Sequence, residues 1–323
     1  MKGEVENMSL SENIKNYIRE ALDMDLVGIA SASALSGEPE GHRPEDLLPG
    51  AKSVIVFGRA LSDGAMQGMF RAHEDKKVQA QSAYAAYCDD LAPNFLLVND
   101  SFRLACFLED SYGCVAMPLP FNVQQSMIPE SYPGKFFADP YGQGMPLDIW
   151  KAAMAAGIGE FGWSNRFVTK EFGPRQMLSA VLTTLELEAD GPYMGEPVCL
   201  GESCGICARV CPTGAIPGVC GGCTAVKAVE GKVQEVGKID PAACTVAALG
   251  MRKEFQGRVP VPNLIMHNEP DDAELAAAFE KKPVNGLSIE HFPRYFCERC
   301  LIYCPLGRWK ERFADTGFTS FEA

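Results

Sequence analysis

The stretch CLGESCGICARVCP, residues 199–212, places four cysteines close together and ends on a Cys-Pro pair. A second stretch, CERCLIYCP at 297–305, repeats the C-x2-C-x3-C-P ending of the first. Cysteines three residues apart allow one loop to wrap around a metal centre with its thiolates pointing inward. Both stretches therefore predict metal sites. The Cys-Pro endings favour iron–sulfur clusters over a zinc site or a set of buried thiols.

The spacing also predicts how the thiols are shared between two centres. In bacterial ferredoxin runs with this spacing, the last cysteine before the proline binds the other cluster. Cys211 and Cys304 hold that position here. We therefore expect each centre to draw ligands from both stretches.

Length and composition predict a globular chain of two domains. The chain has 323 residues, 47% of them hydrophobic and 22% charged. Ten of the 13 cysteines lie between 199 and 304, which predicts a separate cysteine-rich domain. The sequence Asp190-Gly-Pro192 gives the expected boundary, with domains at 1–191 and 192–323. Thiols at these spacings indicate metal binding instead of a disulfide framework.

Charge and hydropathy weigh against several classes of protein. The net charge is −13 and no dense Lys/Arg block is present, so a nucleic-acid partner is not expected. The first 20 residues contain no apolar segment typical of an export signal. No apolar run approaches the roughly 20 residues that a membrane span needs. We expect a soluble, cytoplasmic protein.

Hydrophobic periodicity predicts alternating helices and strands in the first domain. Helices are expected at 10–23, 77–110 and 146–156, and strands at 26–30, 51–58, 114–120 and 177–187. Ser11 is the expected N-cap of the first helix, Pro146 is expected in the first turn of the third, and Gly157 ends it. Cys88, Cys106 and Cys114 have no metal-ligand spacing and are expected in the core. The first domain is therefore predicted to be α/β.

The run AAMAAGIGEFGWSNRFVTKEFGPRQMLSAVLTTLELEAD at 152–190, followed by CGICARVCPTGAI at 204–216, resembles the epoxyqueuosine reductase and reductive dehalogenase family. The segments LVGIA at 26–30 and LLPGAKSVIVFG at 47–58 fit the same pattern, so the resemblance extends over about residues 14–305. It implies a nitroreductase-like α/β domain that holds cobalamin. It also implies a following ferredoxin-like domain that carries two [4Fe-4S] clusters.

The resemblance implies two ligand sets. Cys199, Cys204, Cys207 and Cys304 would bind one cluster, and Cys211, Cys244, Cys297 and Cys300 the other. The chain departs from the family pattern at Gly201, where the first cysteine is expected. Cys199 lies two residues earlier, at a plant-type ferredoxin spacing. Residues 216–240 read as an insertion, and its Cys220 and Cys223 are either an alternative source of that ligand or a separate thiol pair.

The resemblance also indicates residues near the cofactor. Gly157, Gly159 and Gly162 would let the backbone approach a macrocycle, although a tight turn between helix and strand explains them equally well. They follow a helix, so they are not a dinucleotide-binding motif. Three further residues lie in the loop before the third helix. Tyr141 is the expected proton donor, and Asp139 is the second choice. The alternative is that both belong to a surface turn. Gln143 stands where the queuosine enzymes have an aspartate.

These observations predict a corrinoid-dependent iron–sulfur reductase. Its electron donor would be a low-potential protein such as ferredoxin or flavodoxin, and its substrate a small molecule. One alternative is an electron-transfer partner or activator of another corrinoid protein, without bound cobalamin. Another is a flavin-binding, nitroreductase-like protein with a fused ferredoxin part.

Overall fold

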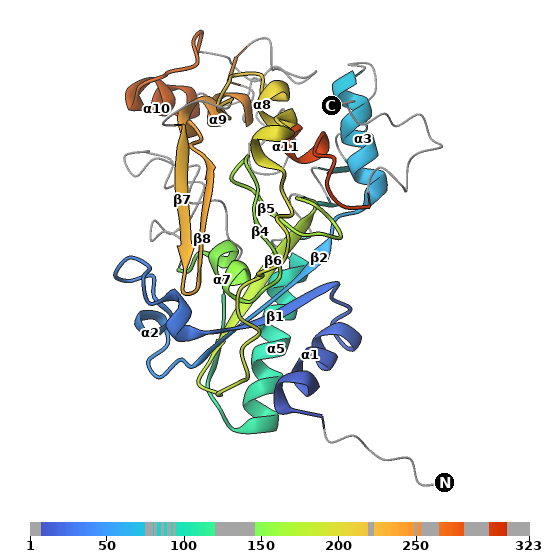
Figure 1. Ribbon diagram of the computed structural model, residues 1–323, viewed down its shortest axis with the longest axis vertical. Coiled ribbons are helices and arrows are strands. Elements are labelled where there is room, and N and C mark those ends of the chain that lie inside the picture. Colours follow the sequence, from blue (N-terminus) through green and yellow to red (C-terminus); the bar gives the residue numbers. More distant parts are fainter. Residues whose placement is uncertain are drawn as a thin grey trace.

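The computed structural model describes residues 8–74, 80, 83–84, 87–88, 92, 95–119, 146–218, 223–248, 251–252, 265–280 and 297–308. Its largest sheet has four strands in the order β1-β2-β6-β3, and every neighbouring pair is antiparallel (Figure 1). The strands are β1 (Leu26–Ser31), β2 (Ser53–Ala60), β3 (Ala116–Pro118) and β6 (Gln176–Thr183). The strands predicted from the sequence lie within one to four residues of these bounds.

Strand β2 is covered on both faces, as its continuous apolar sequence predicts. Successive side chains of a strand point to opposite faces of the sheet. Val54 and Val56 accordingly belong to the core on one face, and Ile55 and Phe57 to the core on the other. All four side chains are fully buried.

Two helices cover the face of the sheet that Ile55 and Phe57 share: α1 (Leu10–Glu20) and α5 (Leu97–Tyr112). The N-cap of α1 is Ser9, whose side chain accepts a hydrogen bond from the Glu12 backbone N–H. The prediction of Ser11 as the cap was wrong because Ser11 lies inside the helix. There its hydroxyl accepts a bond from the Glu188 backbone. Gly113 ends α5 in the left-handed conformation, as expected.

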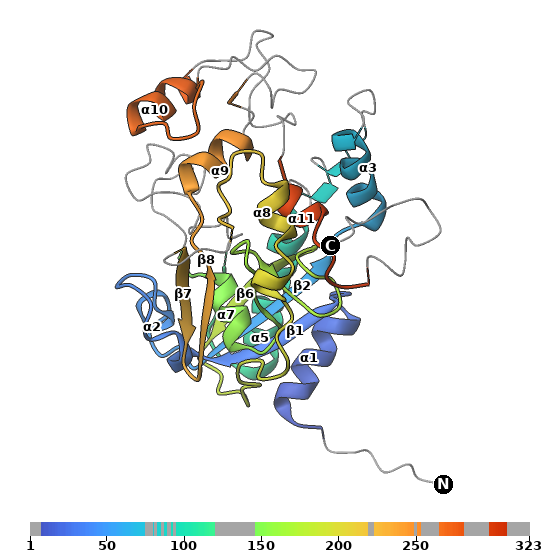
Figure 2. The same cartoon turned by 45° about the horizontal axis from the view of Figure 1, so that its top comes forward.

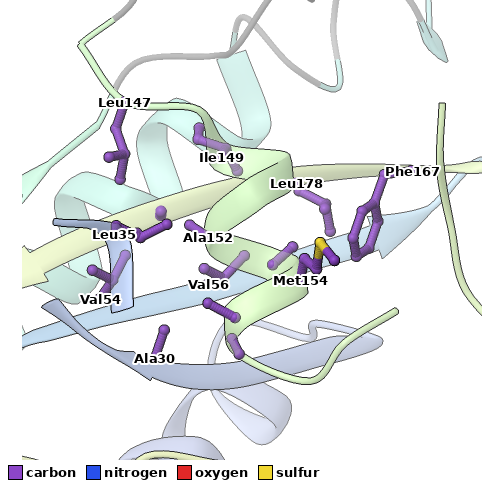
Figure 3. Close-up of a cluster of buried hydrophobic side chains, with 14 of the residues drawn as sticks. Ala30, Leu35, Val54, Val56, Leu147, Ile149, Ala152, Met154, Phe167 and Leu178 are labelled. Atoms are coloured by element: carbon purple, nitrogen blue, oxygen red, sulfur yellow. The ribbon is translucent and has the colours of Figure 1, made fainter. Parts of the chain in front are cut away.

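Helix α7 (Ile149–Ala155) covers the opposite face, with Ala152 and Met154 directed at the sheet (Figure 3). It begins later than Pro146 predicts, because the Asp148 side chain caps it by accepting bonds from the backbone of Trp150 and Lys151. Gly157, at φ +71°, ends it as expected. The packing of this helix on the sheet therefore fixes the position at which the glycine-rich segment 157–175 begins.

Several short elements complete the first part of the chain. They are the 3-10 helix η1 (Ala32–Leu35), α2 (Pro44–Leu47), α3 (Asp63–Glu74), β4 (Glu160–Phe161) and β5 (Phe167–Val168). Helix α3 was not predicted from the sequence. Strands β4 and β5 pair with each other and enclose a tight turn at residues 162–166.

The cysteine-rich part consists of short elements joined by loops (Figure 2). They are η4 (Gly201–Ser203), α8 (Ile206–Val210), β7 (Thr224–Val229), β8 (Lys232–Gly237), α9 (Pro241–Ala248), α10 (Asp272–Glu280) and α11 (Arg299–Ile302). The predicted insertion forms the β7–β8 hairpin, which stands beside α7 (Figure 1). Val236 of β8 is fully buried in the same core as α7. The insertion is therefore an integral part of the packing.

The two predicted domains are tightly joined. Lys232 of the second predicted domain lies 3.1 Å from the Glu160 carboxylate of the first. Met66 and Phe70 of α3 share a core with Val210 and Leu301 of the cysteine-rich part. The boundary itself stays a prediction. In the part of the chain that the structure describes, no helix combines the length and apolar character needed to cross a membrane.

Candidate metal centres

The two cysteine stretches have the same local structure. In each, the residue after the first cysteine of the C-x2-C-x3-C-P motif is left-handed: Gly205, after Cys204, at φ 59° and Glu298, after Cys297, at φ 41°. One short helix follows, α8 in the first stretch and α11 in the second, and it carries the next cysteine. Helices α8 and α11 contact each other. The repeat seen in the sequence is thus a structural repeat, and it brings the two stretches side by side.

One group of four thiols, which we call the first set, consists of Cys199, Cys204, Cys207 and Cys304. Burial raises the pKa of the Cys304 thiol to about 12, and the neighbouring thiols of Cys199 and Cys204 raise it too. Burial also raises the pKa of Cys207, with Cys300, Cys199 and Cys304 as neighbours. These interactions link residues about 100 positions apart in the sequence into one group.

The other four thiols, the second set, are Cys211, Cys244, Cys297 and Cys300. Burial raises the pKa of Cys244 well above its usual range, and its neighbouring thiols are Cys300, Cys297 and Cys211. Burial raises the pKa of Cys297 to about 12, with Cys300 and Cys211 again among its neighbours. Cys244, which lies within α9, therefore has three cysteines as neighbours, and its role as a ligand stays a prediction. All eight thiols of the two sets are free.

The surroundings of both sets are apolar. Trp163, Ile216 and Ile239 form a buried cluster. Five of the eight cysteines pack against this cluster: Cys199, Cys207, Cys211, Cys244 and Cys300. Thiols with raised pKa values are protonated at neutral pH, so binding of a metal centre must displace protons. A pair of iron–sulfur clusters fits this donor set, since it replaces eight buried thiols by bound thiolates.

The arrangement differs from a site for a single metal ion. Among the described residues, no three or more His, Cys, Asp or Glu side chains are grouped so that they could hold one ion. A cubane cluster makes a different demand, because each thiolate binds its own iron atom at a corner of the cluster.

The β4–β5 turn touches one sulfur of each set. The Trp163 backbone N–H donates to Cys199 Sγ at 3.4 Å, and Arg166 Nε donates to Cys300 Sγ at 3.1 Å. The left-handed Asn165 at φ 59° closes the turn between these two residues. This turn, residues 162–166, therefore contacts both candidate centres through Trp163 and Arg166.

The charge of Arg166 is balanced by a carboxylate. Its guanidinium lies 2.5 Å from Glu298 Oε2, and both side chains are nearly buried. Burial alone would lower the pKa of Arg166, but Glu298 and Cys300 raise it well above its ordinary value. Arg166 is therefore a permanent cation beside the second set.

A second buried arginine fixes the chain around Cys304. The Arg175 guanidinium donates to the carbonyls of Leu301 at 3.1 Å and Cys304 at 2.9 Å, and also to that of Leu306. Burial lowers the pKa of Arg175 to about 10, so it stays charged at neutral pH. Arg175 directly precedes β6 of the main sheet, so these bonds anchor the second cysteine stretch to that sheet.

The segment that carries Cys199 is held by a buried carboxylate. Glu160 of β4 accepts bonds from the backbone N–H groups of Val198 at 2.6 Å and Cys199 at 3.2 Å. Its other oxygen lies 3.1 Å from Lys232 Nζ in the hairpin. Glu160 therefore ties Cys199, β4 and the insertion together.

The three predicted glycines are each surrounded by protein atoms. A Cβ at Gly157 would lie 2.6 Å from the carbonyl of Gly191, and one at Gly159 would lie 2.2 Å from that of Val168. A Cβ at Gly162 would approach Val168 Cγ1 at 3.1 Å and Cys199 Sγ at 3.7 Å. The absence of a side chain at Gly157 and Gly159 is thus required by close chain packing, in agreement with the tight-turn alternative.

The remaining predicted residues have three different outcomes. Tyr141, Asp139, Gln143 and Cys220 lie outside the described residues. Cys223 is disulfide-bonded, and a disulfide sulfur is not a thiolate ligand. Cys88 is buried in the core as expected, whereas Cys106 and Cys114 are only half-buried.

Four residues beside the centres were not predicted from the sequence: Glu160, Trp163, Arg166 and Arg175. The charged ones lie in or directly beside strands: Glu160 in β4, Arg166 before β5 and Arg175 before β6. Charged residues in such places are buried only when they are paired.

Comparisons with known proteins agree with the resemblance in the sequence. No family model matches the chain. Epoxyqueuosine reductase of Gloeobacter violaceus is 28% identical over 253 residues, which are 69% of this chain and 67% of that protein. Tetrachloroethene reductive dehalogenase of Dehalobacter restrictus is 36% identical over 81 residues, which are 25% of this chain and 14% of the dehalogenase.

A solved epoxyqueuosine reductase, in complex with an epoxyqueuosine-modified tRNA-Tyr stem loop, has the same fold with a TM-score of 0.50. The match covers 93% of this chain and 65% of that chain, at 18% identity. The chain is a distant relative of epoxyqueuosine reductases and reductive dehalogenases. Both relatives are reductases by name, so the relationship points to an oxidoreductase with the mixed α/β fold of this family. The chain spans about two thirds of the epoxyqueuosine reductases and a much smaller share of the dehalogenase.

Proposed function

We propose that this chain is an iron–sulfur oxidoreductase that binds two [4Fe-4S] clusters, one in the first set and one in the second. The observation that carries the proposal is the pairing of the thiols. Most thiol interactions within the fold fall inside the ligand sets that the family resemblance implies, and one, between Cys207 and Cys300, joins the two sets. Cys304 interacts with thiols of the first stretch and Cys211 with thiols of the second, which supports the proposed exchange of these two residues between the stretches.

The residues around the sets support binding of clusters. When bound, such clusters carry single electrons at low potential. Five of the eight cysteines pack against the apolar cluster of Trp163, Ile216 and Ile239, which lowers the exposure of their thiols to water. Backbone N–H groups of Trp163 and Gly201 donate to Cys199 Sγ, both at 3.4 Å. Hydrogen bonds to cysteine sulfurs and a dry environment are the features by which proteins tune these centres.

We further propose that the electrons pass to a substrate bound over a corrinoid in the first part of the chain. This step rests on the family relationship. Tyr141 remains the proposed proton donor, with Asp139 next, and Gln143 the proposed substrate or cofactor contact. A ferredoxin or flavodoxin would supply the electrons.

The substrate class is proposed to be a small molecule. The net charge of −13 weighs against a nucleic acid. A related fold, however, was solved with a tRNA stem loop. Charge therefore does not decide the substrate, and binding of a tRNA stem loop belongs among the first assays.

Iron and sulfide analysis after anaerobic reconstitution tests the clusters. We expect about eight iron atoms and about eight sulfides per chain, four of each for every cubane. Zinc at one or two per chain with no iron would contradict the proposal. The ultraviolet–visible spectrum of the same sample tests the cofactor, since corrinoid and flavin have distinct bands.

A second candidate function is that of an electron-transfer partner or activator of another corrinoid protein. The packing at Gly157 and Gly159 favours it, because the chain's own backbone occupies the space beside these glycines. A cluster shoulder without corrinoid bands, retained after incubation with cobalamin, would select this function. Corrinoid bands that co-purify with the chain would exclude it.

A further inference from the structure

We propose that Arg166 raises the reduction potential of the cluster bound by the second set, through the hydrogen bond from its Nε to Cys300 Sγ. The inference rests on the proposed function, because it requires a cluster in that set. The donor and the sulfur lie 3.1 Å apart. The donor is a charged guanidinium, whereas the hydrogen bonds to Cys199 Sγ come from neutral backbone N–H groups.

Arg166 is held in place at both ends. Its backbone belongs to the β4–β5 turn, where the Arg166 carbonyl accepts a 2.7 Å bond from the Gly162 N–H. Its guanidinium donates through Nε to the sulfur and through a terminal nitrogen to Glu298. The side chain is only 13% exposed. A planar fork fixed by two acceptors points its donor at the sulfur in one orientation.

The sign of the effect follows from charge. A cluster that accepts an electron becomes more negative, and part of that charge lies on the cysteine sulfurs. A cationic donor at 3.1 Å stabilises the reduced state more than the oxidised state. The apolar surroundings of Trp163, Ile216 and Ile239 weaken screening by water, so the interaction is stronger than it would be at the surface.

Glu298 opposes this effect. Its carboxylate lies 2.5 Å from the guanidinium and stands one residue after Cys297 and two before Cys300. The carboxylate disfavours added negative charge on the cluster, while it also keeps the guanidinium in position. Removal of either partner should therefore move the potential of the same cluster, in opposite directions.

The first set has a different pattern of contacts. Arg175 lies near it, and its guanidinium donates to the carbonyls of Leu301, Cys304 and Leu306 while its charge favours the Cys304 thiolate. The sulfur of Cys199 accepts from neutral backbone N–H groups. We therefore expect substitution of Arg166 to act on the cluster of the second set, whose Cys300 sulfur it contacts.

Redox titration followed by electron paramagnetic resonance tests the proposal on full-length, reconstituted protein. Iron content and two reducible clusters in the wild type decide first whether the proposed function holds. Arg166→Gln should then lower one of the two midpoint potentials and leave the other unchanged. We expect a change of about tenfold in the reduced-to-oxidised ratio at fixed potential, or about 59 mV for one electron. Glu298→Gln should raise the same midpoint.

The matched control is Arg19→Gln, which removes the same charge from a half-exposed arginine of α1, outside the cysteine-rich part of the chain. It should move neither midpoint. Unchanged midpoints in Arg166→Gln with full iron content would overturn the proposal and leave Arg166 a packing role. If Arg166→Gln loses iron, the Glu298→Gln variant decides, because it keeps the bond from Arg166 to the sulfur. An unchanged or lowered midpoint in Glu298→Gln would overturn the proposal.

Discussion

The two cysteine stretches share spacing, a left-handed residue and a short helix, yet they are supported differently. The first uses Gly205 at the left-handed position, whereas the second uses Glu298, which such a conformation strains. Glu298 is held there by Arg166. The first stretch is also tied to the β7–β8 hairpin through Glu160. Identical spacing therefore specifies where thiols converge, while the surrounding charges differ between the two sites.

The largest expected effect is loss of the second set. Cys300→Ser should remove about half of the iron, since one of two four-iron clusters loses a ligand. It should also destabilise the cysteine-rich part, because the bound centre joins α8, α9 and α11. Iron analysis and thermal unfolding under argon measure both effects. The control is Cys106→Ser at a half-buried thiol outside both sets, which should keep all the iron.

The next effect concerns the first set and its unusual Cys199. Cys199→Ser should lower the iron content, because the plant-type spacing and two N–H bonds to its sulfur fit a ligand. Cys223→Ser should leave the iron content at the wild-type level, since Cys223 is disulfide-bonded. Loss of iron in Cys223→Ser with full iron in Cys199→Ser would indicate that the hairpin segment supplies the ligand. The two sets would then no longer draw their ligands in the proposed way.

A smaller effect is expected at the carboxylate that supports Cys199. Glu160→Gln leaves Lys232 nearly buried without its counter-charge, which costs about 3–5 kcal/mol of stability. Glu186→Gln breaks an exposed pair with Lys52 and should cost at most about 1 kcal/mol. Melting temperatures of the two variants give the comparison. Equal melting temperatures would show that the hairpin does not depend on Glu160.

The smallest effect tests the left-handed position. Gly205→Ala should cost roughly 1–2 kcal/mol, because a Cβ is strained at φ 59°. Gly64→Ala, in helix α3 and away from positive φ, should be neutral or stabilising by up to about 1 kcal/mol. The opposite signs separate backbone strain from a general effect of added volume. A stabilising Gly205→Ala would contradict the left-handed assignment.

The sequence predicted most of the sheet because its strands are apolar runs bounded by glycine and proline. Residues 54–57 illustrate this. The strand is buried on both faces, so its sequence is a continuous apolar run without alternating polar residues. Caps were less predictable. Ser9 and Ser11 are both suitable, and only the packing of Glu188 against Ser11 decides between them.

The local structure of the two cysteine stretches could be predicted because the C-x2-C-x3-C-P spacing recurs in both, whereas the assignment of their thiols to two clusters stays a prediction. Arg166, Glu160 and Arg175 could not be predicted, since their partners lie more than 30 residues away in the chain. Nothing in a local pattern indicates that an arginine in a tight turn will meet Cys300. Such long-range pairs become visible only when the two parts of the chain are placed together.

The sharing of thiols between the stretches has a consequence for synthesis of the protein. The strands of the main sheet are complete once residue 183 has been made, so this part can fold early. Each thiol set, by contrast, includes at least one cysteine from 297–304. Neither centre can be completed until the last part of the chain has left the ribosome. We therefore expect metal loading to be a late event in maturation, with the thiols from 199 to 244 waiting in reduced form until that segment arrives.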